Sequence, residues 1–317
     1  MLKFGIMGCG GISSRFCAAL SREKNVEVSA VAAREKAKAE EFAAKYNAKR
    51  ALTYEELVKD TDVDIIYIGT VNSEHYRQIK LCLENGKNVL CEKPMVMTGK
   101  LARECFALAK EKKLFLMEAM WTRCNPCFLA AKKMVENGRI GEVKLISANF
   151  CFRNDFNPES RLYNKDLGGG ALYDLGVYTI EFATGIMGVN PESVSGSLTY
   201  AATGVDEAAS ITLKFPGGAL ASLNSCFNVT AQNDANIYGT RGSILLKEFY
   251  TARDCYVFTE NRVGDILLHE DFIDGFAYQI RHVVDLFERG CLVSDLIPPE
   301  DTIACADIFD TLLADKG

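Results

Sequence analysis

One lysine in this sequence stands where an α/β protein would use it for chemistry. Lys93 follows the short run Val-Leu-Cys-Glu at residues 89–92 and directly precedes Pro94. A strand over that run would be buried, and Lys93 would emerge at its carboxyl end, the edge at which open parallel sheets bind ligands. Because lysine is rarely buried without a partner or a task, we interpret it as a candidate site residue. A charged strand end on a solvated loop is the alternative.

A glycine-rich turn near the N-terminus has the residue types and spacing that bind a dinucleotide. Gly8 permits a tight turn, and Gly10 lets the backbone approach a pyrophosphate. Gly11 and Ile12 then open a helix, whose free N–H groups and positive dipole end favour an anion. The third glycine position of the fingerprint holds Ser13, which is small enough for close helix packing. The context of strand, turn and helix predicts dinucleotide binding.

The end of the second predicted strand bears on the choice between NAD and NADP. Proteins that bind NAD usually place Asp or Glu there to accept a hydrogen bond from the ribose 2′-hydroxyl. Here the strand over residues 26–33 ends without a carboxylate, and Arg34 follows. A guanidinium pairs well with a 2′-phosphate, so we predict NADP as the cofactor, with NAD possible. An exposed arginine at a helix start is the alternative.

Composition and charge exclude several classes of protein. The 317 residues are 48% hydrophobic and 25% charged, which is typical of a soluble globular protein with two domains. A net charge of −6 argues against nucleic-acid binding, which needs clustered Lys and Arg. No apolar run is long enough to span a membrane, and no signal segment is evident. We therefore expect a cytoplasmic protein without nucleic-acid or membrane partners.

The cysteines and histidines do not indicate a metal site. Twelve cysteines are scattered along the chain, many within apolar patterns, as expected for small buried hydrophobes in a cytosolic protein. Cys124 and Cys127 have redox or half-site spacing, but a zinc site needs two further ligands. The histidines, which are His75, His269 and His282, include no spaced pair. We predict no metal.

Strand and helix signals alternate over the first third of the chain and then change. The first predicted strands are 3–7, 26–33, 65–69, 87–91 and 115–118, and the intervening helices are 12–22, 35–46, 54–58, 74–85 and 100–112. This alternation predicts a doubly wound parallel sheet, a Rossmann domain over residues 1–119.

After residue 120 the pattern favours an α+β domain over residues 120–317. Strand-like runs separated by short turns predict a large, mostly antiparallel open sheet. The predicted strands are 143–152, 193–200, 208–215, 219–227, 236–238, 243–246 and 255–259, and the predicted helices are 125–137, 275–288 and 302–314. We expect this domain to bind substrate and to mediate self-association.

With these pieces in place, the chain resembles the Gfo/Idh/MocA oxidoreductase family over nearly its whole length. The segments that carry the resemblance are the Gly8 turn, Gly-Thr-Val-Asn-Ser-Glu-His at 69–75, Glu-Lys-Pro at 92–94 and Gly-Gly-Gly-Ala-Leu-Tyr-Asp-Leu-Gly-Val-Tyr at 168–178. Residues 118–123 and 138–141 are most similar to the dihydrodiol dehydrogenase branch.

The chain departs from the usual family pattern at two positions. Many members have proline where this chain has Val71, so the turn there is expected to be looser. Many members also have histidine where this chain has Tyr178. Tyrosine at that position resembles the dihydrodiol dehydrogenase, glucose–fructose oxidoreductase and NADP-dependent xylose dehydrogenase branches.

The resemblance implies catalytic roles for three residues. Oxidising an alcohol sends hydride to the nicotinamide while a base removes the hydroxyl proton, and free tyrosine titrates at about pH 10, too high for that task. In the family pattern Tyr178 is the acid/base, and the Lys93 ammonium favours its phenolate by about 1–3 pKa units. Asp174, four residues before Tyr178 on one helix, would accept from a substrate hydroxyl or orient Lys93. The peptide before Pro94 is implied to be cis.

The resemblance also implies binding residues. The cofactor would contact Gly8, Gly10, Gly11, Ile12, Arg34, Thr70, Asn72, His75, Glu92 and Lys93. The substrate would contact Trp121, Arg123, Tyr163 and Asp174. His75 could instead cap its helix, and Trp121 and Arg123 could instead pack at the domain junction. The glycines at 168–170 would let the backbone lie close to nicotinamide or substrate.

The function that follows is an NAD(P)-dependent dehydrogenase or reductase acting on a sugar or polyol, such as a cyclic vicinal diol. An NAD-dependent glycosidase of the same family is an alternative, marked by sugar release without net cofactor turnover. A non-enzymatic nucleotide-sensing regulator is another, although a sensor need not keep Lys93, Asp174 and Tyr178 together. A sheet with one uncovered apolar face favours self-association, so we expect a homodimer or homotetramer.

Overall fold

The computed structural model describes residues 1–259, 262–269 and 274–314. The chain divides into two compact units. The first comprises Met1–Val96, Lys100–Ala119 and Phe276–Thr302, and the second comprises Met97–Gly99, Met120–Gly275 and Ile303–Gly317. The sequence did not indicate that residues 276–302 return to the first unit.

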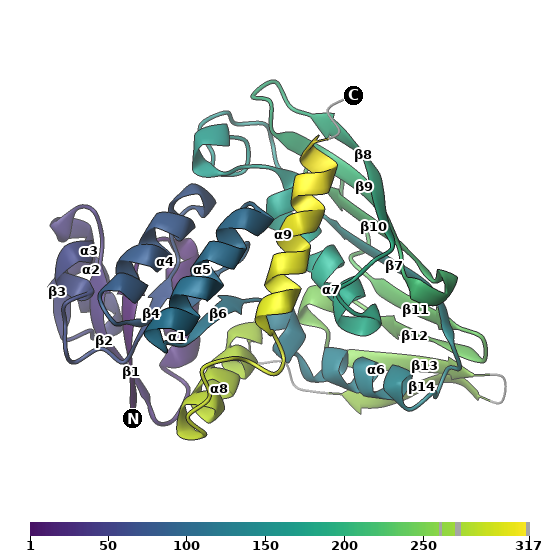
Figure 1. The fold of residues 1–317 in the computed structure, drawn as a ribbon, viewed down its shortest axis with the longest axis horizontal. Helices are drawn as coiled ribbons and strands as arrows, with labels where there is room; N and C mark the ends of the chain where they lie inside the picture. Colours follow the sequence, from purple (N-terminus) through teal and green to yellow (C-terminus); the bar gives the residue numbers. More distant parts are fainter. Residues whose placement is uncertain (260–261, 270–273, 315–317) are drawn as a thin grey trace. The chain divides into compact units, whose positions relative to one another are not determined.

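The first unit contains a parallel sheet with strand order β3-β2-β1-β4-β5-β6 (Figure 1). That order is the one of a Rossmann fold, so the predicted doubly wound domain is confirmed. The strands are β1 (Leu2–Met7), β2 (Val26–Ala32), β3 (Arg50–Leu52), β4 (Ile65–Ile68), β5 (Asn88–Glu92) and β6 (Leu116–Ala119). The sequence pattern missed β3, because three residues are too few to show a period.

Helices connect these strands and cover the sheet. They are α1 (Gly11–Leu20), α2 (Lys36–Tyr46), α3 (Tyr54–Leu57), the 3₁₀ turn η1 (Asn72–Glu74), α4 (His75–Glu84) and α5 (Gly99–Lys112). From Phe276 onward, the later helix α8 (Gly275–Glu288) also belongs to this unit. All four residues of β4 are buried. A parallel strand covered on both faces reads as a continuous apolar run, which explains why the sequence predicted it.

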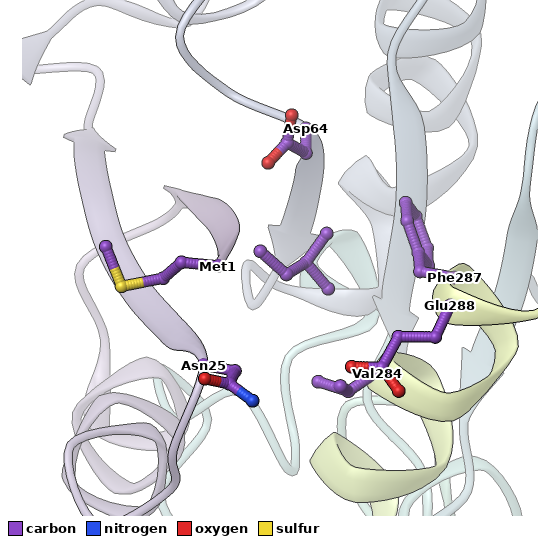
Figure 2. Close-up of a pocket in the computed structure, with 7 residues that line it drawn as sticks. Met1, Asn25, Asp64, Val284, Phe287 and Glu288 are labelled. Atoms are coloured by element: carbon purple, nitrogen blue, oxygen red, sulfur yellow. The ribbon is translucent and has the colours of Figure 1, made fainter.

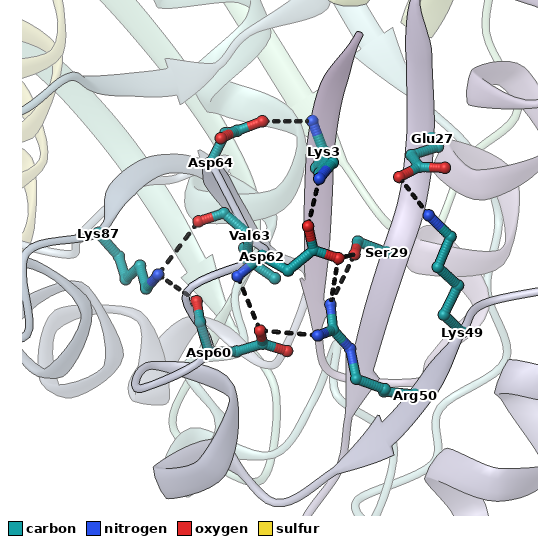
Figure 3. Close-up of polar contacts among 10 residues, drawn as sticks. All are labelled: Lys3, Glu27, Ser29, Lys49, Arg50, Asp60, Asp62, Val63, Asp64 and Lys87. Atoms are coloured by element: carbon teal, nitrogen blue, oxygen red, sulfur yellow. Dashed lines mark hydrogen bonds and ion pairs between the residues drawn. The ribbon is translucent and has the colours of Figure 1, made fainter.

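Charged side chains tie three strands to the turn before β4 (Figure 3). Arg50 on β3 bonds Asp60 at 2.9 Å and Asp62 at 3.0 Å, and Ser29 on β2 donates to Asp62 at 3.1 Å. Lys3 on β1 also pairs with Asp62, and its hydrogen bond is the main reason why the pKa of that carboxyl is lowered. This network lies at the amino end of the sheet, so its role is structural.

The second unit contains a mixed sheet with strand order β14-β13-β12-β11-β7-β10-β9-β8. Among the described strands of this sheet, β7 and β10 pair in parallel and the others pair antiparallel, so the prediction of a mostly antiparallel sheet is confirmed. The strands are β7 (Val143–Cys151), β8 (Ser193–Tyr200), β9 (Asp206–Lys214), β10 (Leu220–Cys226), β11 (Ala235–Gly239), β12 (Gly242–Leu246), β13 (Asp254–Thr259) and β14 (Arg262–His269). The sequence pattern missed β14.

Helices α6 and α7 cover one face of this sheet. Helix α6 (Pro126–Glu136) packs on β12 and β13, and α7 (Val177–Met187) packs on β7 and β10. The part of α9 (Pro299–Ala314) from Ile303 onward also belongs to this unit, and a Cβ on Gly196 of β8 would lie 2.9 Å from its Leu312. Residues 177–185 of α7 are all buried, so α7 is apolar all round and lies within the core. The short turns are η2 (Trp121–Cys124), η3 (Lys165–Leu167), η4 (Leu172–Gly176), η5 (Pro216–Gly218) and η6 (Phe249–Thr251).

The other face of the sheet exposes a row of large apolar side chains. Leu145 on β7 lies between Leu220 on β10 and Tyr238 on β11 in the strand register. These three residues are 39–42% exposed, whereas the next residue of β7, Ile146, is fully buried. Since successive strand residues point to opposite faces, the row lies on the face away from α7. Within the described ranges, no helix has the length and apolar character needed to cross a membrane.

Candidate cofactor and catalytic sites

The glycine turn between β1 and α1 leaves space that the protein itself does not fill. Gly8 has a φ of +98°, and a Cβ there would lie 2.7 Å from Thr70 Cγ2, so only glycine fits. A Cβ at Gly10 would meet only the Gly69 carbonyl, at 3.9 Å, and one at Gly11 would meet nothing within 4 Å. Internal packing therefore gives no reason for glycine at positions 10 and 11, whereas a closely bound ligand does.

The amino end of α1 suits an anion in that space. The helix begins at Gly11 with Gly10 as its N-cap residue, and no side chain caps its first N–H groups. The first N–H groups of a helix lack partners within the helix, and the dipole adds positive charge there. Ser13 is fully buried, and a Cβ on Gly69 would overlap its hydroxyl. The small Ser13 thus allows α1 to pack closely on the strand end, as expected. A pyrophosphate fits this cradle.

Arg34 lies beside the glycine turn. It is exposed and lies two residues after the end of β2. Burial raises the pKa of the Tyr54 phenol, with the Arg34 charge opposing this rise and Cys9 of the turn adding to it. Arg34, Tyr54 and the turn are therefore neighbours. The first carboxylate after the strand, Glu35, pairs with Lys38 at 3.0 Å.

Buried carboxylates hold the backbone on both sides of Lys93. The Lys93–Pro94 peptide is cis, which confirms the expectation drawn from the family resemblance. Lys93 N–H donates to Glu92 Oε2 at 3.3 Å, and Met95 N–H donates to Glu118 Oε1 at 2.7 Å. Glu92 and Glu118 are only 6% and 2% exposed. The loop is thus fixed by acceptors that water hardly reaches.

Each of these carboxylates has a second buried partner. Tyr67 donates its hydroxyl to Glu92 Oε1 at 2.6 Å, and Thr302 donates to Glu118 Oε2 at 2.8 Å. Burial raises the pKa of Glu92, and the bond from Tyr67 opposes the rise. The Tyr67 ring stacks on Phe16 of α1 with 3.8 Å between centroids. Glu92 therefore links the lysine loop to the helix that follows the glycine turn.

The segment after β4 also contacts the lysine loop. His75 is fully buried at the start of α4, and its Nδ1 lies 2.9 Å from the Pro94 carbonyl. Burial lowers the pKa of His75, so the ring is neutral at neutral pH and its Nδ1–H donates to that carbonyl. Thr70 donates to Gln78 at 2.6 Å, and Asn72 lies half-buried in η1. Contact of these residues with a cofactor stays a prediction.

In the second unit, Asp174 and Tyr178 lie on one helical segment that begins with a π-helical turn. The turn η4 covers Leu172–Gly176, and α7 continues from Val177. Asp174 and Tyr178 are 6% and 7% exposed. A π turn is uncommon and often marks a functional site. The sequence predicted a regular helix here, because the spacing of four residues between Asp174 and Tyr178 does not distinguish the two geometries.

Arg161 and a line of aromatic rings adjoin these two residues. Arg161 Nη1 lies 2.9 Å from Asp174 Oδ1. Phe150 packs edge-on against the Tyr178 ring, with 5.1 Å between centroids. From there the rings of Phe152, Phe227, Tyr163 and Phe156 follow one another at centroid distances of 5.1–6.3 Å. Sequence reasoning missed Arg161, since its pairing depends on the fold of the loop that precedes the glycine run.

Arg123, predicted to contact substrate, has its partners inside the second unit. It is 2% exposed, and its Nη1 donates to the Glu181 carbonyl at 2.9 Å. The guanidinium also lies 3.7 Å from the Glu181 carboxylate and fills the notch left by Gly185, where a Cβ would overlap it. Burial raises the pKa of Glu181, and the charge of Arg123 opposes the rise. These contacts fit the alternative that Arg123 packs within the fold, and its contact with substrate stays a prediction.

The other two predicted substrate residues are also largely buried. Trp121 is 7% exposed, and a Cβ on Gly275 would lie 2.9 Å from its ring. Tyr163 is 2% exposed, and its hydroxyl donates to the Asn154 carbonyl at 3.3 Å. Tyr163 nevertheless belongs to the line of rings that begins at Tyr178. Substrate contact of Trp121 and Tyr163 stays a prediction.

The glycine run before η4 packs against the protein itself. A Cβ at Gly169 would lie 2.6 Å from the Leu162 carbonyl. Gly170 has a φ of +133°, and a Cβ there would overlap the carboxylate of Asp206 on β9. The sequence suggested that these glycines admit nicotinamide or substrate. The structure provides a reason within the fold, and it adds Asp206, which the sequence did not single out.

A cavity in the first unit lies at the opposite end of the parallel sheet from the glycine turn and Lys93 (Figure 2). It measures about 400 Å³ and opens at the amino ends of the first strands. Ligands of open α/β sheets bind at the opposite, carboxyl edge, so we assign it no role. Its lining residues are Met1, Leu2, Asn25, Asp64, Val284, Phe287 and Glu288.

The described part of the chain shows no cluster of three or more His, Cys, Asp or Glu side chains that could hold a metal ion. Cys124 and Cys127 are both buried, and the described cysteines form no disulfide. Neither observation adds a site to those already named.

Comparison with known proteins relates both halves of the chain to one family. Residues 2–120 match the oxidoreductase family with an NAD-binding Rossmann fold, and residues 128–245 match the GFO/IDH/MocA C-terminal domain. The chain is 36% identical to trans-1,2-dihydrobenzene-1,2-diol dehydrogenase of Xenopus tropicalis, over 99% of this chain and 98% of the relative. It is 34% identical to the Homo sapiens protein of the same name, over 98% and 95%.

Solved structures are similar over the same length. KijD10, a 3-ketoreductase from Actinomadura kijaniata in complex with NADP and TDP-benzene, has a TM-score of 0.87 at 26% identity, over 99% of this chain and 97% of that chain. The aldose-aldose oxidoreductase from Caulobacter crescentus shares the fold, with a TM-score of 0.89 at 22% identity over 99% and 96%. With the sequence matches, this establishes that the chain belongs to the Gfo/Idh/MocA family of NAD(P)-binding oxidoreductases.

Proposed function

We propose that this protein transfers hydride between NADP and a CH–OH carbon of a sugar or cyclic vicinal diol. Tyr178 is the acid/base in this proposal, and Lys93 and Asp174 assist it. The observation that carries the proposal is the support of the Lys93 loop by Glu92 and Glu118. Burying carboxylates is costly, and a lysine on a solvated surface loop has no need of such support.

The proposed chemistry conserves atoms and charge. Bound NADP would accept hydride from the alcohol carbon. As that C–H bond breaks, the Tyr178 phenolate takes the hydroxyl proton, so the alcohol becomes a carbonyl compound. The Lys93 ammonium stabilises the phenolate and donates to the reacting oxygen. Asp174, oriented by Arg161, accepts from the adjacent hydroxyl of the substrate, and reduction follows the same steps in reverse.

A ring-shaped substrate with several hydroxyl groups fits the side chains around Tyr178. In the line of aromatic rings that begins at Tyr178, Phe152 and Phe156 keep exposed surface on which the C–H faces of a sugar or cyclic diol would pack. The relatives support this class, since they are named as a dehydrogenase of a cyclic diol and as a 3-ketoreductase. A screen of aldoses, dihydrodiols and inosose-type polyols with NADP would identify the substrate.

We also propose that the protein self-associates through the exposed face of its second sheet. The row of Leu145, Leu220 and Tyr238 is the kind of apolar surface that monomers rarely leave in water. A homodimer or homotetramer would cover it. The proposed location of the protein remains cytoplasmic.

Replacing either proposed acid–base residue should abolish most of the activity. Lys93→Ala and Tyr178→Phe should each lower kcat by at least about 10²-fold, the usual scale for removing acid–base help. Steady-state kinetics with the best substrate of the screen measure this, with Lys144→Ala and Tyr200→Phe as exposed controls. Near-normal rates in both site variants would refute the proposed mechanism.

The NADP preference should depend on Arg34. Arg34→Ala should lower kcat/KM for NADP roughly tenfold, the effect of losing one charge-assisted pair, and leave the value for NAD unchanged. Lys45→Ala, on the last turn of α2, is the matched control. The assignment is wrong if the wild type prefers NAD by about tenfold or more.

The mass of the particle in solution tests self-association. We expect a dimer or larger species at micromolar concentration by light scattering, and a shift toward monomer in Leu145→Glu, because a charge at the centre of the apolar row would be buried. Leu292→Glu changes a leucine of similar exposure in the first unit and should cause no shift. A monomeric wild type would contradict the proposal.

A further inference from the structure

Asp206 is a buried carboxylate, and the hydrogen bonds described for it come from backbone N–H groups. It is the first residue of β9 and is 3% exposed. Its Oδ2 accepts from Leu172 N–H at 2.6 Å. The N–H groups of Ala171 and of Asp206 itself also act on the carboxylate and lower its pKa, against the larger effect of burial. Three backbone donors thus converge on one side chain.

Gly170 makes room for this carboxylate. Its φ of +133° is a conformation that L residues rarely adopt, and a Cβ there would overlap Asp206 Oδ1. The Gly170 N–H donates to the Leu162 carbonyl at 2.9 Å, and its carbonyl accepts from Asp174 N–H at 3.1 Å. The backbone at Gly170 therefore bonds both the preceding loop and the helical segment that follows it.

The bonds to Asp206 act at the start of the segment that holds Asp174 and Tyr178. The first N–H groups of a helix have no partners within it, and a carboxylate there supplies acceptors and the favoured charge. The η4 turn has no side-chain cap from its own N-cap residue. Asp206 supplies the cap from a strand 34 residues further along the chain.

We propose that Asp206 is a positioning residue of the reaction. It fixes the backbone at residues 170–172 and thereby sets the direction of Asp174 and the placement of Tyr178. This inference rests on the proposed function for its catalytic consequence, whereas the fixing of the backbone does not depend on that function.

The catalytic consequence is tested with Asp206→Ala and Asp206→Asn. Asp206→Ala should lower kcat between about 10-fold and 10²-fold, the scale of a small misplacement of reacting groups, and leave the dissociation constant for NADP unchanged. Asp206→Asn keeps one acceptor oxygen, so its kcat should lie between those of Asp206→Ala and the wild type. Asp206→Asn alone provides the test if Asp206→Ala does not fold. A kcat for both folded variants within about twofold of wild type would overturn the proposal.

Asn125→Ala is the matched control for a merely structural role. Asn125 is 2% exposed in the same unit and caps α6 by accepting from Cys127 N–H at 2.8 Å. Its loss should lower the melting temperature as Asp206→Ala does, without lowering kcat of the folded protein. An equal loss of kcat in Asn125→Ala would show that general destabilisation explains both variants, and would overturn the proposal.

Amide hydrogen exchange separates this inference from the proposed function. In Asp206→Ala, the amides of Ala171 and Leu172 should exchange faster, whether or not Tyr178 is the acid/base. Unchanged exchange would refute the fixing of the backbone. Faster exchange with normal activity of Tyr178→Phe would instead refute the proposed function and, with it, the catalytic part of this inference.

The pH dependence of stability gives an independent check on the buried carboxylate. Burial raises the pKa of Asp206 to about 6 from an ordinary value of 3.8. Because the pKa of Asp206 is higher in the folded protein than in the unfolded chain, the protonated carboxyl favours the folded state. This contribution to the free energy of unfolding is fully present below pH 3.8 and is lost as the pH rises through about 6. From about pH 7.5 to about pH 5, the unfolding constant of wild type should fall roughly tenfold relative to Asp206→Asn.

The neighbouring titratable group does not interfere with this measurement. Burial and the charge of Asp206 raise the pKa of the Tyr173 phenol, which therefore stays protonated throughout the range. A ratio of unfolding constants that does not change with pH would show that Asp206 does not titrate as a buried, backbone-bonded carboxylate, and would contradict the inference.

Discussion

Backbone N–H groups that donate to buried carboxylates position the proposed chemistry in both units. Met95 N–H donates to Glu118 beside the lysine loop, and Leu172 N–H donates to Asp206 at the start of the tyrosine segment. Hydrogen bonds with a charged partner are roughly twice as strong as neutral ones. Removing such an acceptor leaves a buried donor unsatisfied. The fold therefore fixes main-chain geometry where small displacements of Lys93 or Tyr178 would matter most.

The glycines show which parts of the fold are built for a ligand. Gly8 and Gly170 are required by positive φ and by contacts within the protein. Gly10 and Gly11 have no such internal requirement, because a Cβ there would enter open space. The space lies at the uncapped start of α1, where free N–H groups favour an anion. The proposed nucleotide site is thus marked by glycines that the fold alone does not need.

The sequence predicted those features that depend on local patterns. Apolar runs with intervening helical periods are enough to indicate the Rossmann sheet, and the Glu-Lys-Pro motif marks its carboxyl edge. The pairing of Arg123 with Glu181 and the backbone hydrogen bond of Asp206 with Leu172 were missed, because the partners lie 58 and 34 residues apart. Such pairs depend on tertiary packing. The π turn at η4 was missed because the spacing of Asp174 and Tyr178 is compatible with either kind of helix.

The central claim is that the ammonium of Lys93 and the phenol of Tyr178 work as one unit. The most direct test is a double-variant cycle of kcat with Lys93→Ala, Tyr178→Phe and the combined variant. Residues that act as a unit have strongly non-additive effects, so we expect the combined variant to be about as slow as the slower single variant. Losses that multiply independently would contradict the account.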